Sequence, residues 1–273
     1  MLKATNSPGA KEVAPWIERL ARVGYAAKAV LYLTVGLLAA QAGLGHGGRT
    51  RDTYGALRVM SGVTLGRVIL LVIATGLTGY ALWRLVDAIA DPERRGIDFK
   101  GIALRTGSLA RAVFHGGLAI AALRLASGDF SGAGGGHPRD WAARALGMPG
   151  GDLLVWLGAA SVAGYGLYQI YRAYVPKLGR HLDLSSLSAG TAKWVVAVSR
   201  FGLAARGLIL CLIGLFFARA AAQQDAAQAG GVRESLGTLA SMGRWIFVAV
   251  ALGLAAYGVY ELVNARYRRI HIE

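Results

Sequence analysis

The chain has 273 residues, of which 55% are hydrophobic and only 16% are charged, and its mean hydropathy is +0.44. A soluble domain is usually about 25% charged, so this composition excludes an ordinary soluble protein and indicates a surface that faces lipid. The formal net charge of +15 would suggest nucleic-acid binding in a soluble protein, but here the basic residues cluster at the ends of apolar runs, as in membrane proteins. We therefore expect no nucleic-acid partner.

Six apolar runs are long enough to cross a membrane, since a spanning helix needs about 20 mostly apolar residues. In chain order, the predicted spans are 23–45, 68–86, 108–125, 153–171, 201–218 and 245–263. The first, third and fifth spans each carry a basic residue near their start, which is tolerated because Lys and Arg side chains can reach the interface. The sequence thus predicts an all-α, polytopic membrane bundle of six transmembrane helices.

The distribution of basic residues predicts the orientation of these spans. Of the 30 Lys and Arg residues, twenty fall on the side that holds both termini, and ten fall on the other side. Cytoplasmic segments carry the excess of Lys and Arg in membrane proteins. We therefore expect a multi-pass protein of the bacterial cytoplasmic (inner) membrane with both termini in the cytoplasm.

Two motifs recur three times along the chain. Each odd-numbered span begins with the pattern Arg-x-Gly-x-x-Ala-basic, at residues 22–28, 105–111 and 200–206. The motif arginines and glycines are Arg22, Arg105, Arg200, Gly24, Gly107 and Gly202, and the final cations are Lys28, Arg111 and Arg206. Each even-numbered span ends with an aromatic pattern that contains Tyr80, Tyr165 or Tyr257. Self-similarity of this kind indicates a repeat architecture.

The repeated unit consists of two spans joined by an outer loop. The predicted units are 16–90, 100–175 and 194–269, preceded by a cytoplasmic tail at 1–15. Because each unit crosses the membrane twice, successive units enter in the same direction, and we expect a pseudo-threefold axis along the membrane normal. Each outer loop has a glycine cluster followed by a stretch that predicts a short interfacial helix, and Asp140 is the expected N-cap of the second.

These motifs resemble those of a bacterial membrane protein family catalogued as domain of unknown function 1206, in which a two-helix module typically occurs three times. The resemblance extends from about Trp16 to Tyr267. It implies the six-span fold and a membrane location, and it implies no activity.

The repeated cations and tyrosines are the candidate functional residues. Lys28, Arg111 and Arg206 each lie six residues after a motif arginine, which places them roughly 9 Å deeper in the membrane. Tyr80, Tyr165 and Tyr257 lie about as far from the same end of their own helices. All six are therefore predicted to share one layer in the cytoplasmic half, where they could hold an anionic solute or the phosphate of a lipid headgroup.

A purely architectural interpretation remains open for the same residues. In that case the cations extend to the interface or pair with nearby groups, the glycines allow close packing, and the tyrosines form the aromatic belt. The third unit alone has a carboxylate, Glu261, at this level, which predicts an ion pair with Lys28 or Arg206. A role of Glu261 in proton coupling is the less favoured alternative.

No motif indicates an enzyme, a metal site or a cofactor. His46 and His137 lie in glycine-rich outer loops and are interpreted as solvated residues, while His115 is expected to hydrogen-bond a neighbouring helix. We expect a structural, accessory or lipid-binding membrane component whose partners are anionic lipids or another membrane protein. The alternative is a channel or transporter for a small anionic solute.

Overall fold

The computed structural model describes residues 15–45, 53–62, 64–89, 98–129, 138–175 and 184–267, together with residues 96 and 182. The long helices are α1 (Pro15–Leu44), α3 (Gly66–Ile89), α4 (Phe99–Ala126), α6 (Gly151–Tyr174), α7 (Ala189–Gln223) and α9 (Arg244–Tyr267). The short ones are α2 (Thr53–Ser61), α5 (Pro138–Leu146), α8 (Val232–Met242) and the 3-10 turn Ala226–Gln228. All six long helices are long and apolar enough to cross a membrane, which confirms the predicted spans.

The three predicted short helices are also present, one between the two spans of each repeat. The expected cap of the second is wrong. Helix α5 begins at Pro138, so Asp140 lies within its first turn. A proline fits the first helical turn, where its missing N–H is not needed, and the Asp140 carboxylate still stabilises the positive end of the helix dipole.

Helix α7 begins twelve residues earlier than the predicted fifth span. The side chain of Ser188 accepts a hydrogen bond from the backbone N–H of Thr191 and caps the helix there. The helix has 35 residues, a length of roughly 50 Å, which exceeds the hydrocarbon thickness. The motif at residues 200–206 therefore lies inside a long helix rather than at its start.

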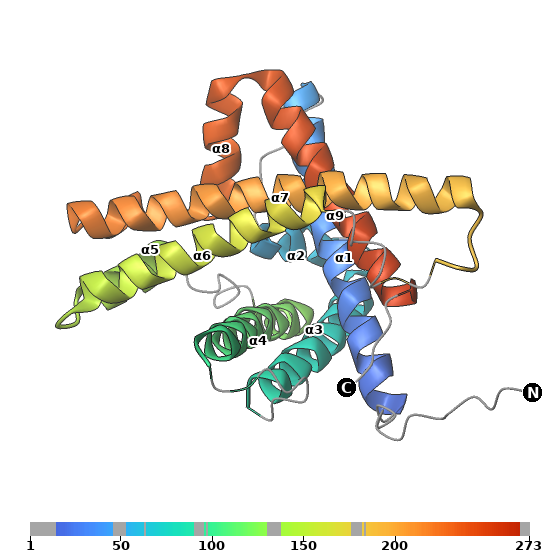
Figure 1. Ribbon diagram of the computed structural model, residues 1–273, viewed down its shortest axis with the longest axis horizontal. Helices are drawn as coiled ribbons and strands as arrows, with labels where there is room; N and C mark the ends of the chain where they lie inside the picture. Colours follow the sequence, from blue (N-terminus) through green and yellow to red (C-terminus); the bar gives the residue numbers. More distant parts are fainter. Residues whose placement is uncertain are drawn as a thin grey trace, which may run out of the picture.

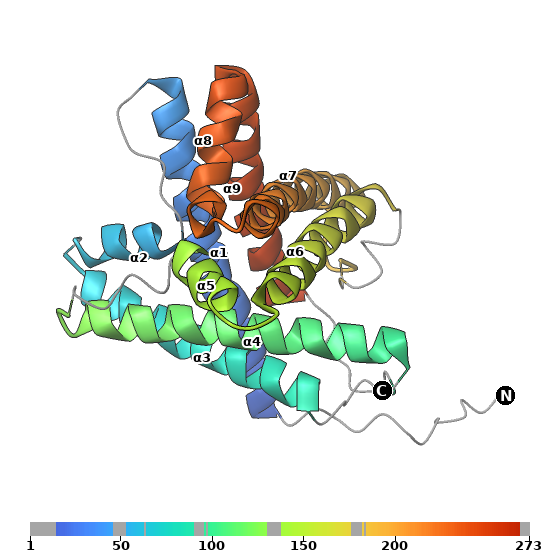
Figure 2. The ribbon, with the colours of Figure 1, turned by 90° about the vertical axis from the view of Figure 1, so that its left-hand side faces the viewer.

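The long helices form three closely packed pairs, α1–α9, α3–α4 and α6–α7 (Figures 1 and 2). In α3–α4 and α6–α7, the second span of one repeat packs against the first span of the next repeat. In α1–α9, the last span of the chain packs against the first. The pairs run in clearly different directions, since α6–α7 lies across the view of Figure 1 and α3–α4 lies across that of Figure 2. The three-unit order is thus visible in the pairing, while the pseudo-threefold axis along the membrane normal stays a prediction.

Glycines bring the paired helices into backbone contact. A Cβ at Gly36 would lie 2.7 Å from the carbonyl oxygen of Ala251 on α9, and one at Gly207 would lie 2.7 Å from the carbonyl oxygen of Gly166 on α6. Helices that associate in a membrane use small residues in this way, because close approach supplies the packing energy that the hydrophobic effect does not.

The two spans within a repeat cross at the motif glycine, but only in the first and third repeats. A Cβ at Gly24 would lie 2.7 Å from the Cβ of Tyr80, and one at Gly202 would lie 2.6 Å from the Cα of Tyr257. In the second repeat, a Cβ at Gly107 would have just one neighbour within 4 Å among the described residues, the Nη2 of Arg111 at 3.9 Å. Within the described residues, α4 and α6 form no interface comparable with α1–α3 or α7–α9.

This difference predicts opposite effects of one substitution at equivalent positions. Gly202→Ala inserts a methyl group into the backbone of α9 and should destabilise the protein by about 1–3 kcal/mol. Gly107→Ala enters open space and should be neutral or stabilising, by up to about 1 kcal/mol, because alanine favours the helix. Thermal unfolding of the purified protein in detergent measures both, and equal effects of the two changes would contradict the assigned crossings.

Candidate functional site

The motif arginines at the start of the odd spans cap the helices with which those spans pair. Arg22 donates hydrogen bonds of 2.8 Å to the carbonyl oxygens of Ala265 and Arg266, in the last turn of α9. Arg105 donates bonds of 2.8 and 3.1 Å to the carbonyl oxygens of Ala88 and Ile89, at the end of α3. A cation at a helix C-terminus satisfies unpaired carbonyls and interacts favourably with the helix dipole.

The third motif arginine, Arg200, begins the corresponding stretch of α7. Its Nε is buried and has no hydrogen-bond partner within the described residues, and the residues that follow Val175 lie outside them. The two described cases show what the arginine of the repeated motif does: it fixes the odd span against the end of the preceding even span.

Six residues deeper, each repeat places its second cation over its own tyrosine. Lys28 Nζ lies 4.8 Å from the ring centre of Tyr80, and the guanidinium carbon of Arg111 lies 5.6 Å from that of Tyr165. Arg206 repeats the arrangement at 4.8 Å from Tyr257. The structure therefore brings together all six residues that the sequence selected, as three cation–π pairs.

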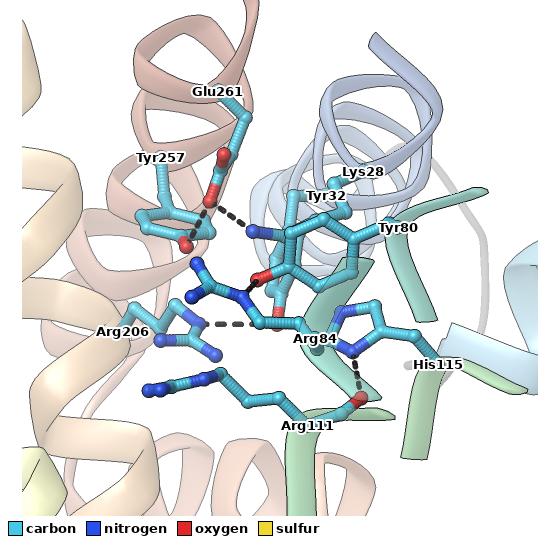
Figure 3. A network of polar contacts seen from close by, with 9 residues as sticks. All are labelled: Lys28, Tyr32, Tyr80, Arg84, Arg111, His115, Arg206, Tyr257 and Glu261. Atoms are coloured by element: carbon cyan, nitrogen blue, oxygen red, sulfur yellow. Dashed lines mark hydrogen bonds and ion pairs between the residues drawn. The ribbon is translucent and has the colours of Figure 1, made fainter. Parts of the chain in front are cut away.

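A buried ion pair joins the first and last spans. Lys28 Nζ donates to Glu261 Oε1 at 2.6 Å, and the hydroxyl of Tyr257 donates to the same oxygen (Figure 3). Lys28 is 5% exposed and Glu261 only 2%. The predicted ion pair of Glu261 is thus confirmed with Lys28.

A second polar chain connects α3 to α4. Arg84 donates to the hydroxyl of Tyr80 at 3.1 Å and to Asp87 Oδ2 at 3.1 Å. Ser108 donates to the same Asp87 oxygen at 2.6 Å and accepts a 3.0 Å bond from Arg111 Nη2.

These contacts close into one loop, here called the charged ring. In order around it, its members are Arg111, Tyr165, Arg206, Tyr257, Glu261, Lys28, Tyr80, Arg84, Asp87 and Ser108. Every one of the six long helices contributes at least one member. The charged ring therefore links side chains from all six predicted spans.

The charges of the ring do not balance. It contains four cations, Lys28, Arg84, Arg111 and Arg206, but only two carboxylates, Asp87 and Glu261. Glu261 forms an ion pair with Lys28 and Asp87 forms one with Arg84, whereas Arg111 and Arg206 form none within the described residues. The surplus therefore falls on Arg111 and Arg206.

These two arginines converge on one tyrosine. The guanidinium carbons of Arg111 and Arg206 lie 5.6 and 5.7 Å from the ring centre of Tyr165. Arg111 Nε and Arg206 Nη1 are buried and have no hydrogen-bond partner in the part of the chain that the structure describes. Buried donors normally find partners, so these two cationic donors call for an explanation, and a bound anion is one that fits their charge.

Comparison of the repeats explains why the Nε of Arg111 has no hydrogen-bond partner among the described residues. Arg206 of the third unit donates to the hydroxyl of Tyr32, which lies four residues after Lys28 in the first unit. The third unit thus pairs with the first, as the second would with the third. The residue in the equivalent position for Arg111 is Leu210, which offers no acceptor.

The architectural interpretation is confirmed in part, because Lys28 pairs with a nearby group, Glu261, and Gly24 and Gly202 allow close packing. Its aromatic belt is wrong for Tyr80 and Tyr257, which are only 2% and 4% exposed. His115 is buried as expected, but its Nδ1 pairs with the carbonyl oxygen of Arg111 in its own helix rather than with a neighbouring helix. Its ring packs against Tyr80.

Four participants in this network were not among the candidate residues: Tyr32, Arg84, Asp87 and Ser108. Asp87 lies on the same helical stripe as Tyr80, and that spacing is the signal that could have added it. Ser108 and Tyr32 have no counterpart of the same type in the other units, and only their packing identifies them. His46 and His137 lie outside the described residues, within which no group of three His, Cys, Asp or Glu residues could hold a metal.

Comparison with known proteins decides the family. The family model described as Domain of Unknown Function (DUF1206) matches the chain three times, at residues 23–91, 106–175 and 201–268. The chain belongs to this family. It is 30% identical over 262 residues to the uncharacterised protein YxxB of Bacillus subtilis (strain 168), which covers 95% of this chain and 94% of the relative. No solved structure matches the chain.

The buried ion pair predicts strong coupling between the first and last spans. Lys28→Met and Glu261→Gln should each destabilise the protein, by about 3–5 kcal/mol, because each leaves one buried charge without its partner. The double variant should lose clearly less than the sum of the two. A double-mutant cycle on thermal unfolding in detergent measures this coupling, and strictly additive effects would show that the pair does not form.

Proposed function

We propose that this protein is a non-catalytic, multi-pass protein of the bacterial inner membrane that binds a phosphate-type oxyanion at the charged ring. The observation that carries the proposal is the convergence of Arg111 and Arg206 on Tyr165, with buried donors that lack partners among the described residues. Figure 3 shows both side chains reaching the same side of the Lys28–Glu261 pair.

The chemistry of these groups favours an oxyanion. A guanidinium presents a planar fork of N–H donors that matches carboxylate and phosphate oxygens. Two such groups near one ring repel each other in a medium of low dielectric constant, and an anion between them removes that repulsion. Binding would thus stabilise the folded protein as well as hold the ligand.

The proposed orientation follows from the charge distribution. The excess of Lys and Arg lies on the side that holds both termini and the Arg-x-Gly motifs of the odd spans. This favours a cytoplasmic location for that side. The charged ring would then lie in the cytoplasmic half of the membrane.

The orientation is tested by cysteine labelling in a Cys211→Ser background. Ser127→Cys follows α4 in an outer connection, and Ser186→Cys lies between α6 and α7. A membrane-impermeant maleimide applied to intact spheroplasts should label Ser127→Cys, and should label Ser186→Cys only after lysis. The reverse pattern would place the termini outside the cytoplasm.

The anion site predicts ligand-dependent stability. Inorganic phosphate should raise the thermal unfolding temperature of the wild-type protein in detergent, because a ligand that binds only the folded state stabilises it. Arg111→Gln and Arg206→Gln should each weaken binding by about tenfold or more, since each loses a charge-assisted hydrogen bond.

The chain offers matched controls on the same two helices. Arg124 on α4 and Arg219 on α7 are exposed and lie away from the charged ring. Arg124→Gln and Arg219→Gln should leave the phosphate effect unchanged. If all four variants respond to phosphate alike, the effect is general ionic stabilisation and the site is wrong.

Transport of the anion is the competing function, and reconstitution separates it from binding. Proteoliposomes loaded with radiolabelled phosphate should retain it as long as protein-free vesicles do. Release that depends on Arg111 and Arg206 would replace the binding proposal with a channel or transporter.

A further inference from the structure

We infer that the anion bound at the charged ring is the headgroup of a phosphate-monoester lipid, which reaches Arg111 through the open seam between α4 and α6. This inference rests on the proposed anion site and adds the class of ligand and its route. The seam is defined here by Gly107 and Arg111 on α4 and by Ser161 and Tyr165 on α6.

The seam exists because, in the part of the chain that the structure describes, the second repeat lacks the helix crossing that the other two repeats form. Position 161 is occupied by serine, whereas the equivalent residues Gly76 and Gly253 contact α1 and α7 in their own repeats. Ser161 is exposed and its hydroxyl donates only to the carbonyl oxygen of Leu157, one turn earlier in α6. The charged ring is therefore closed by direct helix packing in two repeats, and in the second by the contact of Arg111 with Tyr165.

The surroundings of the seam are suited to hydrocarbon. Only 22% of the most apolar window of α6 is buried, against 61% for α9, so α6 is the span most open to the surroundings. Phe114 and Tyr168, three residues after Arg111 and Tyr165, are 47% and 50% exposed. A soluble anion using this route would have to leave water for an apolar medium, whereas a lipid has acyl chains that remain in it.

A second feature concerns the glycines of α6. A Cβ at Gly158 or Gly164 would meet no atom within 4 Å, so this part of α6 carries no covering side chain from the described residues. Gly158 lies seven residues before Tyr165 and therefore on the same helix face. An acyl chain could lie along this face while its phosphate reaches Arg111 and Arg206.

The charge of the ring favours a monoester. Its four cations and two carboxylates leave a surplus of two positive charges. A phosphate monoester carries about −1.5 to −2 charges at neutral pH, whereas a phosphodiester lipid carries only one. Phosphatidic acid has the required headgroup, and phosphatidylglycerol is the matched diester.

The test compares three ligands on delipidated protein in detergent: dioctanoyl phosphatidic acid, dioctanoyl phosphatidylglycerol and glycerol 3-phosphate. Phosphatidic acid should bind at least about tenfold more tightly than either of the others, and Arg111→Gln with Arg206→Gln should abolish that preference. Native mass spectrometry gives the stoichiometry, and thermal shift gives the affinity.

Two variants of α6 test the route. Ser161→Leu fills the seam one turn from Tyr165, while Ala160→Leu adds the same side chain at an exposed position on another face. Ser161→Leu should weaken phosphatidic acid binding by about tenfold and leave glycerol 3-phosphate binding unchanged, and Ala160→Leu should change neither.

The outcomes separate this inference from the proposed function. If glycerol 3-phosphate binds as tightly as phosphatidic acid, and both depend on the two arginines, the anion site stands and the lipid is wrong. Equal affinity for the diester overturns the monoester assignment, and an unaltered Ser161→Leu variant overturns the route. If no phosphate compound binds in an arginine-dependent way, the proposed function itself fails.

Discussion

A lysine ammonium buried within a membrane must be neutralised locally, and the Lys28–Glu261 pair meets that requirement between two spans that are 233 residues apart in the chain. Desolvating the two charges costs several kcal/mol each, so the pair is tolerated only because Tyr257 and Tyr80 surround it with a hydroxyl donor and an aromatic face. The pair links α1 to α9, which also pack through Gly36, and the charged ring continues from it through α3, α4, α6 and α7.

The repeat supplies two kinds of contact, which lie at two positions along the helices. Near the ends of the helices, the motif arginines Arg22 and Arg105 bind the last carbonyls of the paired span. Deeper in, the second cation of each unit lies over its tyrosine. The motif that the three units share supplies three cations and no counter-ion. Glu261 and Asp87, each present in one unit, pair with Lys28 and Arg84, and the positive charge that remains lies on Arg111 and Arg206.

Periodicity and repetition were sufficient to predict the spans and the short helices, and they selected the six cations and tyrosines that form three cation–π pairs, because these features depend on local spacing. The Lys28–Glu261 pair was predictable as one of two choices, since only one unit offers a carboxylate at that depth. The pairing of each even span with the next unit, and the roles of Tyr32 and Ser108, depend on helix packing that has no signature in a single sequence. The early start of α7 was missed because its first turns are less apolar than the span itself.

The closure of the ring by its first and last spans has a consequence for biosynthesis. The first span emerges from the ribosome long before its counter-ion is made, and at about 5–20 residues per second the delay is on the order of tens of seconds. During that interval Lys28 has no carboxylate partner, and its ammonium group must be solvated by water or lipid headgroups. Assembly of this fold can therefore be completed only after the last span has been translated. A product truncated before Glu261 would leave Lys28 without its counter-ion.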